Sequence, residues 1–131
     1  MSSVRPATAK SRILIVEDHD DTRIMLGMMM QCEGFDVCCV ASPAEALTCA
    51  QAFQPSVIIS DIGLPQMDGY QLIEELRSLP GLEQVPAIAL TGFAERAPQF
   101  QTSSSVFDLH LAKPVDYNLL FEKLNQLVQA I

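Results

Sequence analysis

Acidic residues follow two short apolar runs of this chain, and a threonine and a lysine follow two others. Glu17 and Asp18 come directly after "ILIV", and Asp61 comes two residues after "VII". Thr91 follows "AIAL", and Lys113 comes two residues after "LHL". Carboxylates that converge within a few ångströms repel one another and therefore need a cation. If the fold brings these side chains together, they can bind a metal ion and hold an anionic group.

The chemistry of this set points to a magnesium ion and a phosphoryl group. Oxygen ligands favour a hard cation, and a few carboxylates completed by water suit Mg²⁺ better than Ca²⁺. A lysine ammonium and a threonine hydroxyl beside that ion can hold phosphoryl oxygens. A carboxylate can itself be the nucleophile and form an aspartyl phosphate when a metal neutralises the charge. The set as a whole is more specific than any one of its members.

Five apolar runs alternate with five helical patterns, which predicts an α/β fold. At least the first, third and fourth runs are continuously apolar, as in parallel strands covered on both faces. We expect strands at 13–16, 36–40, 57–59, 87–90 and 109–111, and helices at 21–33, 43–52, 70–79, 94–104 and 116–129. Because ligands bind at the carboxyl ends of such strands, the candidate side chains should share one edge of the sheet. Asp61 would then lie at an exposed strand end rather than in the core.

The stretch 94–104 is a weak helix candidate. It carries Pro98 early, followed by Thr102 and a run of serines that continues to Ser105, and these residues are unfavourable in a helix interior. We therefore expect this helix to be short, distorted or mobile.

The composition fits one ordinary domain and argues against several classes of protein. Hydrophobic residues make up 49% and charged residues 18% of the 131 residues, which excludes a disordered acidic chain. A formal charge of −8 argues against direct nucleic-acid binding, which needs a basic face. No apolar run approaches the ~20 residues that span a bilayer, and the first residues lack a hydrophobic signal core. We expect a cytoplasmic protein without membrane insertion, with a flexible tail over 1–11 and one domain over 12–131.

The remaining candidate ligands do not form a recognisable metal motif. The cysteines are Cys32, Cys38, Cys39 and Cys49. They lack the paired spacing of a zinc site, and we interpret them as free buried thiols in a reducing compartment. His19 has no second histidine nearby in the sequence, so we do not assign it to a transition-metal site.

Four motifs, taken together, resemble the receiver domain of response regulators in two-component phosphorelays. They are "ILIVEDHD", "VIISDIGLPQMDGY", "IALTG" and "LAKPVD". The resemblance covers roughly Arg12 to Ala130 and implies a flavodoxin-like (βα)5 three-layer sandwich. Its parallel five-stranded sheet would have the strand order 2-1-3-4-5. By this resemblance the chain would be a stand-alone receiver or part of a hybrid histidine kinase, and its motifs slightly favour the second.

The resemblance also implies a set of metal ligands around the phosphoacceptor. By position, Asp61 would be the phosphoacceptor and would also face the Mg²⁺ ion. Asp18 would bind the ion directly, whereas Glu17 would act mainly through water. The backbone carbonyl of Gly63 would be a third protein ligand.

Further residues would contact the phosphoryl group or respond to it. Thr91 would contact a phosphoryl oxygen and Lys113 would pair with the phosphoryl group, with a cis peptide bond before Pro114. His110 lies where the family usually has a Tyr or Phe that rotates during switching. Histidine can also rotate, and it titrates near neutrality. The simpler alternative is an ordinary half-exposed residue on the last strand.

The partners implied are those of a phosphorelay. The donor would be a phosphohistidine on a histidine kinase or on a histidine phosphotransfer domain. Phosphorylation would reshape the face formed by the helix at 94–104, the strand at 109–111 and the last helix, for an unknown effector. The chain would be a monomer or a weak phosphorylation-linked dimer. It would catalyse its own phosphorylation and dephosphorylation without being a conventional enzyme.

Other functions stay open as alternatives. A receiver-like module that binds without phosphorylation is disfavoured because Asp18, Asp61, Thr91 and Lys113 are all present. An aspartate-dependent phosphatase would need a second acid two residues after its nucleophile, where this chain has Gly63. A flavin or nucleotide binder would need a Gly-rich loop after the first strand, where "EDHDD" would repel phosphate.

Overall fold

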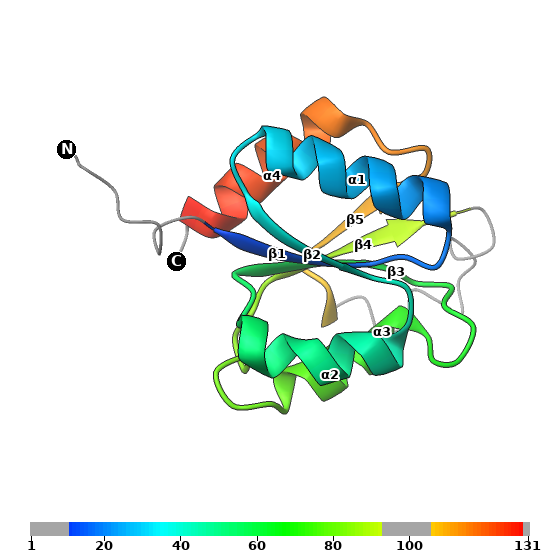
Figure 1. The fold of residues 1–131 in the computed structure, drawn as a ribbon, viewed down its shortest axis with the longest axis vertical. Helices are drawn as coiled ribbons and strands as arrows, with labels where there is room; N and C mark the ends of the chain where they lie inside the picture. Colours follow the sequence, from blue (N-terminus) through cyan, green and yellow to red (C-terminus); the bar gives the residue numbers. More distant parts are fainter. Residues whose placement is uncertain (1–10, 93–105, 130–131) are drawn as a thin grey trace.

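A computed structural model describes residues 11–92 and 106–129, which form a five-stranded sheet with helices on both faces (Figure 1). In chain order the elements are β1 Arg12–Val16, α1 Asp20–Cys32, β2 Asp36–Val40, α2 Pro43–Phe53, β3 Val57–Asp61, α3 Gly69–Arg77, β4 Ala87–Thr91, β5 Leu109–Ala112 and α4 Tyr117–Gln129. The helix predicted at 94–104 and residues 1–10 of the predicted tail lie outside the described residues.

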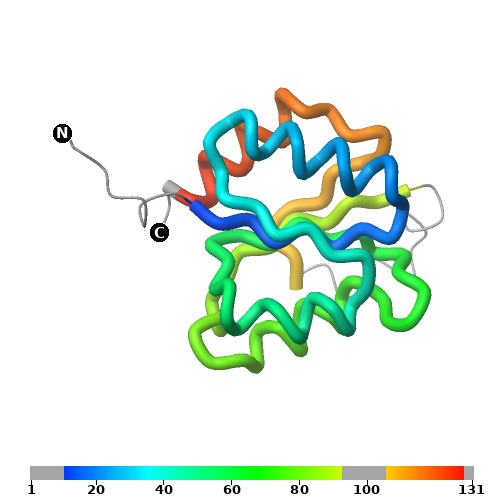
Figure 2. Tube along the Cα trace, in the orientation of Figure 1, coloured from blue at the N-terminus to red at the C-terminus, as the bar shows by residue number. Residues whose placement is uncertain are grey.

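The sheet is parallel throughout and has the order β2-β1-β3-β4-β5, which confirms the predicted fold class. Helices α1 and α4 cover one face, and α2 and α3 cover the other, as the tube in Figure 2 also shows. Because β1 lies between β2 and β3, the strand order reverses at β1. In sheets of this kind, ligands bind in the crevice outside the carboxyl ends of the strands at such a reversal.

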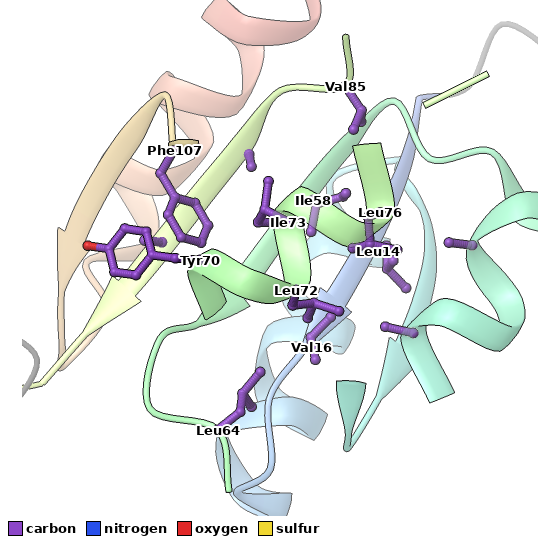
Figure 3. Packing of buried hydrophobic residues seen from close by; sticks show 14 of the residues in the cluster. Leu14, Val16, Ile58, Leu64, Tyr70, Leu72, Ile73, Leu76, Val85 and Phe107 are labelled. Carbon is purple, nitrogen blue, oxygen red and sulfur yellow. The ribbon is translucent and has the colours of Figure 1, made fainter. Parts of the chain in front are cut away.

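The strands are buried on both faces because successive side chains of a strand point to opposite sides. Ile13 and Ile15 of β1 pack in a core cluster with residues of α1 and α4. Leu14 and Val16 pack in a second cluster with residues of α2 and α3, which Figure 3 shows from close by. Two-sided burial therefore explains the continuously apolar runs.

Side-chain caps fix where two helices of one face begin. Ser42 precedes α2, and its hydroxyl accepts a hydrogen bond from the Glu45 N–H at 3.2 Å. Asp68 precedes α3 and accepts from the Gln71 N–H at 2.9 Å. No helix within the described ranges is both long enough and apolar enough to cross a membrane.

The strand ends differ from the prediction in a way that matters for chemistry. β3 extends to Asp61 and β4 extends to Thr91, so both residues end strands instead of lying in loops. Asp61 is only 4% exposed, so the expectation of an exposed strand end was wrong. The loop that leads to α3 returns to the end of β3, because the Gly69 N–H donates to the Ile62 carbonyl at 2.9 Å.

The cysteines are free, but the prediction that all four are buried was wrong. Cys38 and Cys49 are half-buried, whereas Cys32 and Cys39 are exposed. Cys32 is the last residue of α1, and Cys39 lies on β2, an edge strand of the sheet. Positions at a helix end and on an edge strand have fewer neighbours to cover them.

Candidate functional site

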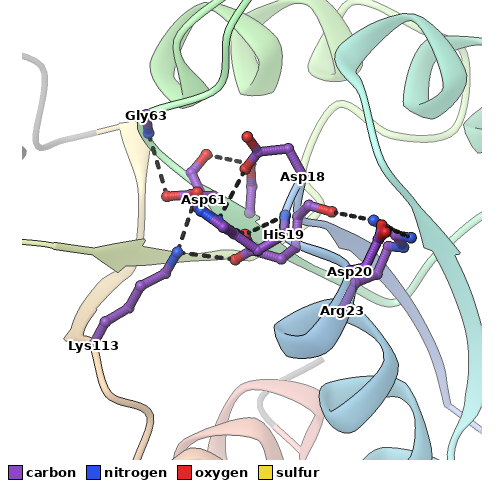
Figure 4. A network of polar contacts seen from close by, with 9 residues as sticks. Asp18, His19, Asp20, Arg23, Asp61, Gly63 and Lys113 are labelled. Carbon is purple, nitrogen blue, oxygen red and sulfur yellow. Dashed lines mark hydrogen bonds and ion pairs between the residues drawn. The ribbon is translucent and has the colours of Figure 1, made fainter.

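Three carboxylates and a histidine meet where β1 and β3 end (Figure 4). One possible ligand atom from each of Glu17, Asp18, His19 and Asp61 lies within 4.8 Å of the others. The register explains the convergence, because Val16 of β1 pairs with Ser60 of β3 and the acids follow directly. We refer to Glu17, Asp18 and Asp61 as the carboxylate cluster.

Glu17 is fully buried, and its side chain is held by the groups around it. Its Oε2 accepts the His19 backbone N–H at 3.1 Å and lies 3.1 Å from Nδ1 of the same residue. Its Oε1 lies 3.0 Å from the Lys113 ammonium. Its backbone is fixed as well, because its N–H donates to Val40 of β2 and its carbonyl accepts from the Arg23 guanidinium, each at 3.1 Å. A buried carboxylate needs such contacts to offset its lost hydration.

Asp61 has fewer compensating contacts. Its Oδ2 lies 3.2 Å from the Lys113 ammonium, and its Oδ1 accepts the Gly63 backbone N–H at 3.3 Å. Burial raises the pKa of the Asp61 carboxyl, and the negative charge of Glu17 raises it further, while Lys113 acts in the opposite direction. The charge on Asp61 is therefore only partly balanced by the protein.

Lys113 links the two buried carboxylates. Its ammonium contacts both Glu17 and Asp61, and its backbone N–H donates to the Thr91 carbonyl at 2.8 Å. Burial acts to lower the pKa of Lys113, but the hydrogen bond to Glu17 and the charges of Asp61 and Glu17 outweigh it and raise the pKa. The side chain is therefore a cation at neutral pH. The peptide bond to Pro114 is cis, as the resemblance implied.

Asp18 is a half-buried member of the carboxylate cluster whose side chain contacts His19. Its Oδ1 is buried and accepts no hydrogen bond from the described residues, although it lies 3.5 Å from Nδ1 of His19. That histidine is exposed, and its hydrogen bond to Glu17, aided by the charge of Asp18, raises its pKa. Three carboxylates thus share one lysine and one histidine, which leaves the cluster short of positive charge.

For two predicted site residues, Thr91 and His110, no side-chain contact with the carboxylate cluster is recorded within the described ranges. Thr91 is buried at the end of β4, and its hydroxyl donates to the Leu111 carbonyl at 3.5 Å. His110 is on β5, where Nε2 lies 3.2 Å from the Tyr70 hydroxyl and the ring centroid lies 5.6 Å from that of Phe107. Partial burial of its ring lowers the pKa of His110. His110 is therefore one of three packed rings.

Gly69 and Tyr70 shape the end of the loop after Asp61. A Cβ on Gly69 would lie 2.8 Å from the Asp61 carbonyl oxygen, so only glycine permits this close approach of α3 to β3. Tyr70 follows directly and reaches His110. The only sequence signal for this contact was weak: Tyr70 is an aromatic residue at the start of a helix, two positions after the capping residue Asp68. His19 was dismissed for lack of a second histidine, yet its ring contacts Glu17.

Comparisons with known proteins identify relatives of this chain. The sequence pattern of the response regulator receiver domain matches residues 13–125. An uncharacterized 14.6 kDa protein from Leptolyngbya boryana is 40% identical over 108 residues, which are 82% of this chain and 82% of that protein. The regulatory protein AtoC of Escherichia coli is 34% identical over 123 residues, which are 93% of this chain but only 25% of AtoC. The chain therefore spans about a quarter of that relative's length.

A solved structure adds a metal to the comparison. The receiver domain of the sensor histidine kinase PA1611 from Pseudomonas aeruginosa PAO1 superposes with a TM-score of 0.81 and 29% identity. The match covers 92% of this chain and 99% of that one. That structure has a magnesium ion coordinated in its active-site cleft.

Proposed function

Since this chain belongs to the response regulator receiver domain family of two-component signalling, we propose that Asp61 accepts a phosphoryl group from a phosphohistidine. The observation that carries the proposal is the placement of Asp61. It is a buried carboxylate at a strand end that contacts Lys113 and lies beside two further acids. Burial keeps water away from the nucleophile, and the contact with Lys113 holds one of its oxygens in place.

The transfer proposed is an in-line displacement at phosphorus. One carboxylate oxygen of Asp61 attacks, a P–O bond forms, and the P–N bond to the donor imidazole breaks. The imidazole nitrogen leaves with the bonding electron pair and is free to take a proton from solvent. Hydrolysis would reverse the modification, because water attacks phosphorus, the P–O bond to Asp61 breaks, and phosphate leaves.

Two further residues would handle the phosphoryl oxygens. Lys113 contacts the Asp61 carboxylate, so its ammonium lies where negative charge would arrive. Thr91 ends the neighbouring strand, and Leu90 before it pairs with Asp61 in the ladder. The Thr91 hydroxyl donates to Leu111 over a long 3.5 Å, a weak bond that a phosphoryl oxygen can replace.

The carboxylate cluster fits a divalent cation. The three acids offer only oxygen atoms, and Asp18 has a buried oxygen without a hydrogen bond among the described residues. We propose that Asp18, Asp61 and the Gly63 carbonyl bind Mg²⁺ directly, with Glu17 acting through water. The bound ion would supply positive charge that lets Asp61 and a phosphoryl group approach each other.

Receiver domains interact with histidine kinases or phosphotransfer proteins, and a protein of one of these kinds would be the donor here. The response to phosphorylation would involve Thr91, His110 and the surface of β5 and α4. The contact of His110 with Tyr70 supports this, because Tyr70 lies at the start of α3, directly after the loop that follows Asp61. The effector, the cytoplasmic location and the monomeric or weakly dimeric state stay predictions from the sequence.

Phosphorylation by a small P–N donor tests the proposal. The protein is incubated with phosphoramidate and Mg²⁺, and its intact mass is followed with time. Wild type should gain one phosphoryl group, Asp61→Asn should gain none, and EDTA should prevent the gain. Asp21→Asn is the matched control, because Asp21 is an exposed acid in the first turn of α1, outside the carboxylate cluster.

An unmodified wild type would contradict the proposal if a known receiver domain became labelled in the same buffer. The phosphorylation-independent binding module would then be the better account. Equal labelling of wild type and Asp61→Asn would place the acceptor elsewhere and would also overturn the proposal.

A further inference from the structure

Two half-buried thiols lie apart from the carboxylate cluster and face each other. Cys38 is on β2 and Cys49 is on α2, and their Sγ atoms are 3.6 Å apart. Both side chains pack against the core cluster between the sheet and helices α2 and α3. This is the one sulfur–sulfur contact recorded within residues 11–92 and 106–129.

The alternation of β2 explains why Cys38 and not its neighbour meets Cys49. Cys39 points to the opposite face of the sheet, where its Sγ lies 3.9 Å from the Arg23 carbonyl of α1. A Cβ on Gly27 of α1 would lie only 2.7 Å from that sulfur, so Cys39 packs closely against this helix. Adjacent cysteines thus serve different interfaces, and only Cys38 has a second thiol in contact.

We propose that Cys38 and Cys49 form a dithiol site that a hydroperoxide oxidises to an intramolecular disulfide. The two sulfurs must approach by about 1.5 Å to reach the bonding distance of about 2 Å. A change of this size is within the reach of side-chain rotation. The two residues are 11 positions apart, so the bond would close a short local loop.

The proposed oxidation proceeds in two balanced steps. The Cys38 sulfur attacks one oxygen of the hydroperoxide and the O–O bond breaks. The leaving oxygen takes the Cys38 proton and departs as an alcohol, or as water when the oxidant is hydrogen peroxide, so that Cys38 becomes a sulfenic acid. The Cys49 sulfur then attacks the Cys38 sulfur, the S–S bond forms, the S–O bond breaks, and the oxygen leaves as water with the Cys49 proton. The two thiols lose two electrons, and the hydroperoxide is reduced to alcohol and water.

The contacts of the two thiols differ, and this bears on which of them is oxidised first. Burial and the hydrogen bond with Cys38 raise the pKa of Cys49 to about 11, so Cys49 holds its proton at neutral pH. Its Sγ lies 3.8 Å from the Ala46 carbonyl oxygen within α2, to which the thiol donates. No such acceptor is recorded for Cys38 among the described residues, so the proposal assigns the first oxidation to Cys38.

The disulfide would tie α2 to the edge strand of the sheet. Among the described strands β2 pairs only with β1, and its last residue, Val40, accepts the backbone N–H of Glu17. The link would thus reinforce the strand that helps to place Glu17. We expect the oxidised protein to melt at a higher temperature than the reduced protein.

Peptide mapping of the oxidised full chain tests this proposal independently of phosphorylation. The reduced protein is treated with hydrogen peroxide, remaining thiols are blocked with a maleimide, and peptides are analysed without reduction. We expect a linked Cys38–Cys49 peptide, loss of maleimide labelling at both positions, and return of the labelling after dithiothreitol. In Cys49→Ser, dimedone should trap the sulfenic acid at Cys38.

The double variant Cys32→Ser and Cys39→Ser is the matched control and should form the same linked peptide as wild type. Full maleimide labelling of both Cys38 and Cys49 after peroxide would overturn the proposal. So would linked peptides that join Cys32 or Cys39 to another cysteine in place of the Cys38–Cys49 pair. Because the first result comes from the wild-type chain, it does not depend on whether a variant folds.

Discussion

Two charged networks lie at opposite ends of the strands and balance their charges differently. At the amino ends of β4 and β5, the Arg77 guanidinium donates to the Val85 carbonyl from Nε and Nη2 at 3.1 and 2.8 Å. Its Nη1 donates to the Val106 carbonyl at 2.6 Å, and Nη2 lies 3.4 Å from Asp108. Asp108 in turn accepts the Ala87 N–H at 2.8 Å. We call these contacts the Arg77 network.

The carboxylate cluster at the other end of the strands has an excess of one sign of charge. Three acids share one lysine and one histidine, and Asp18 has a buried oxygen without a hydrogen bond among the described residues. The Arg77 network pairs its cation with carbonyls and one acid. Buried polar groups stabilise a fold when they are matched, and they cost free energy when they are not. The contrast fits the proposal that the Arg77 network supports the fold and that the carboxylate cluster binds a cation.

The largest effect on stability is expected from Arg77→Leu. The substitution keeps an apolar stem but leaves the Val85 and Val106 carbonyls without their charged donor. We expect the free energy of unfolding to fall by about 3 kcal/mol, in the range for hydrogen bonds to charged groups. Denaturant titration measures it. Glu74→Gln on the exposed side of α3 is the control, and equal stability of the two variants would contradict the role of Arg77.

The next largest effect on stability is expected from Mg²⁺, which would supply the positive charge that the carboxylate cluster lacks. Mg²⁺ at about a hundred times its Kd should stabilise the wild type by about 2.7 kcal/mol, since a ligand that binds only the folded state shifts the equilibrium. The gain should be much smaller for Asp18→Asn and unchanged for Asp21→Asn. Thermal unfolding with and without EDTA provides the measurement. Equal gains in both variants would show that the ion binds outside the carboxylate cluster.

Replacement of an aspartate by asparagine should change the melting temperature in opposite directions in the two networks. Without metal, Asp61→Asn removes a buried charge that burial and Glu17 both disfavour, so the melting temperature should rise by a few degrees. Asp108→Asn removes the anionic partner of Arg77, so the melting temperature should fall slightly. Differential scanning calorimetry in EDTA compares them. Two shifts of the same sign would remove the distinction drawn between the networks.

The smallest effect is expected from His110, which lies between the two networks on β5. Partial burial lowers its pKa below the ordinary value of 6.5, so the unfolded chain binds the proton more readily than the folded one. Its contribution is therefore fully present above pH 6.5 and is lost as the pH falls through the lower folded pKa. As the pH falls through this range, the melting temperature of the wild type should decrease relative to that of His110→Phe. A pH-independent difference would contradict it.

The strand pattern was readable because parallel strands buried on both faces leave continuous apolar runs. The βα alternation then brought Asp18 and Asp61 to one edge without any knowledge of distances. The burial of Asp61 was not readable, because it depends on tertiary contacts such as the one with Lys113. The alternation of β2 could have separated Cys38 from Cys39, but the rotation of α2 that brings Cys49 to Cys38 is set by tertiary packing.

The Arg77 network left even less trace in the sequence. Its acceptors are mostly backbone carbonyls, and every residue carries one, so residue types do not mark them. Helix ends were also misplaced, since α3 ends at Arg77 instead of 79. The guanidinium reaches Val85 and Val106 only once β4 and β5 lie side by side. Such contacts follow from the fold and cannot be read before it.

The central claim is that Asp61, and no other acid of the carboxylate cluster, carries the phosphoryl group. Borohydride reduction of the phosphorylated protein converts an aspartyl phosphate to homoserine, and peptide sequencing locates it. We predict homoserine at position 61 in the wild type and in Asp21→Asn. Homoserine at position 18, or a labelled protein without homoserine at 61, would contradict the account.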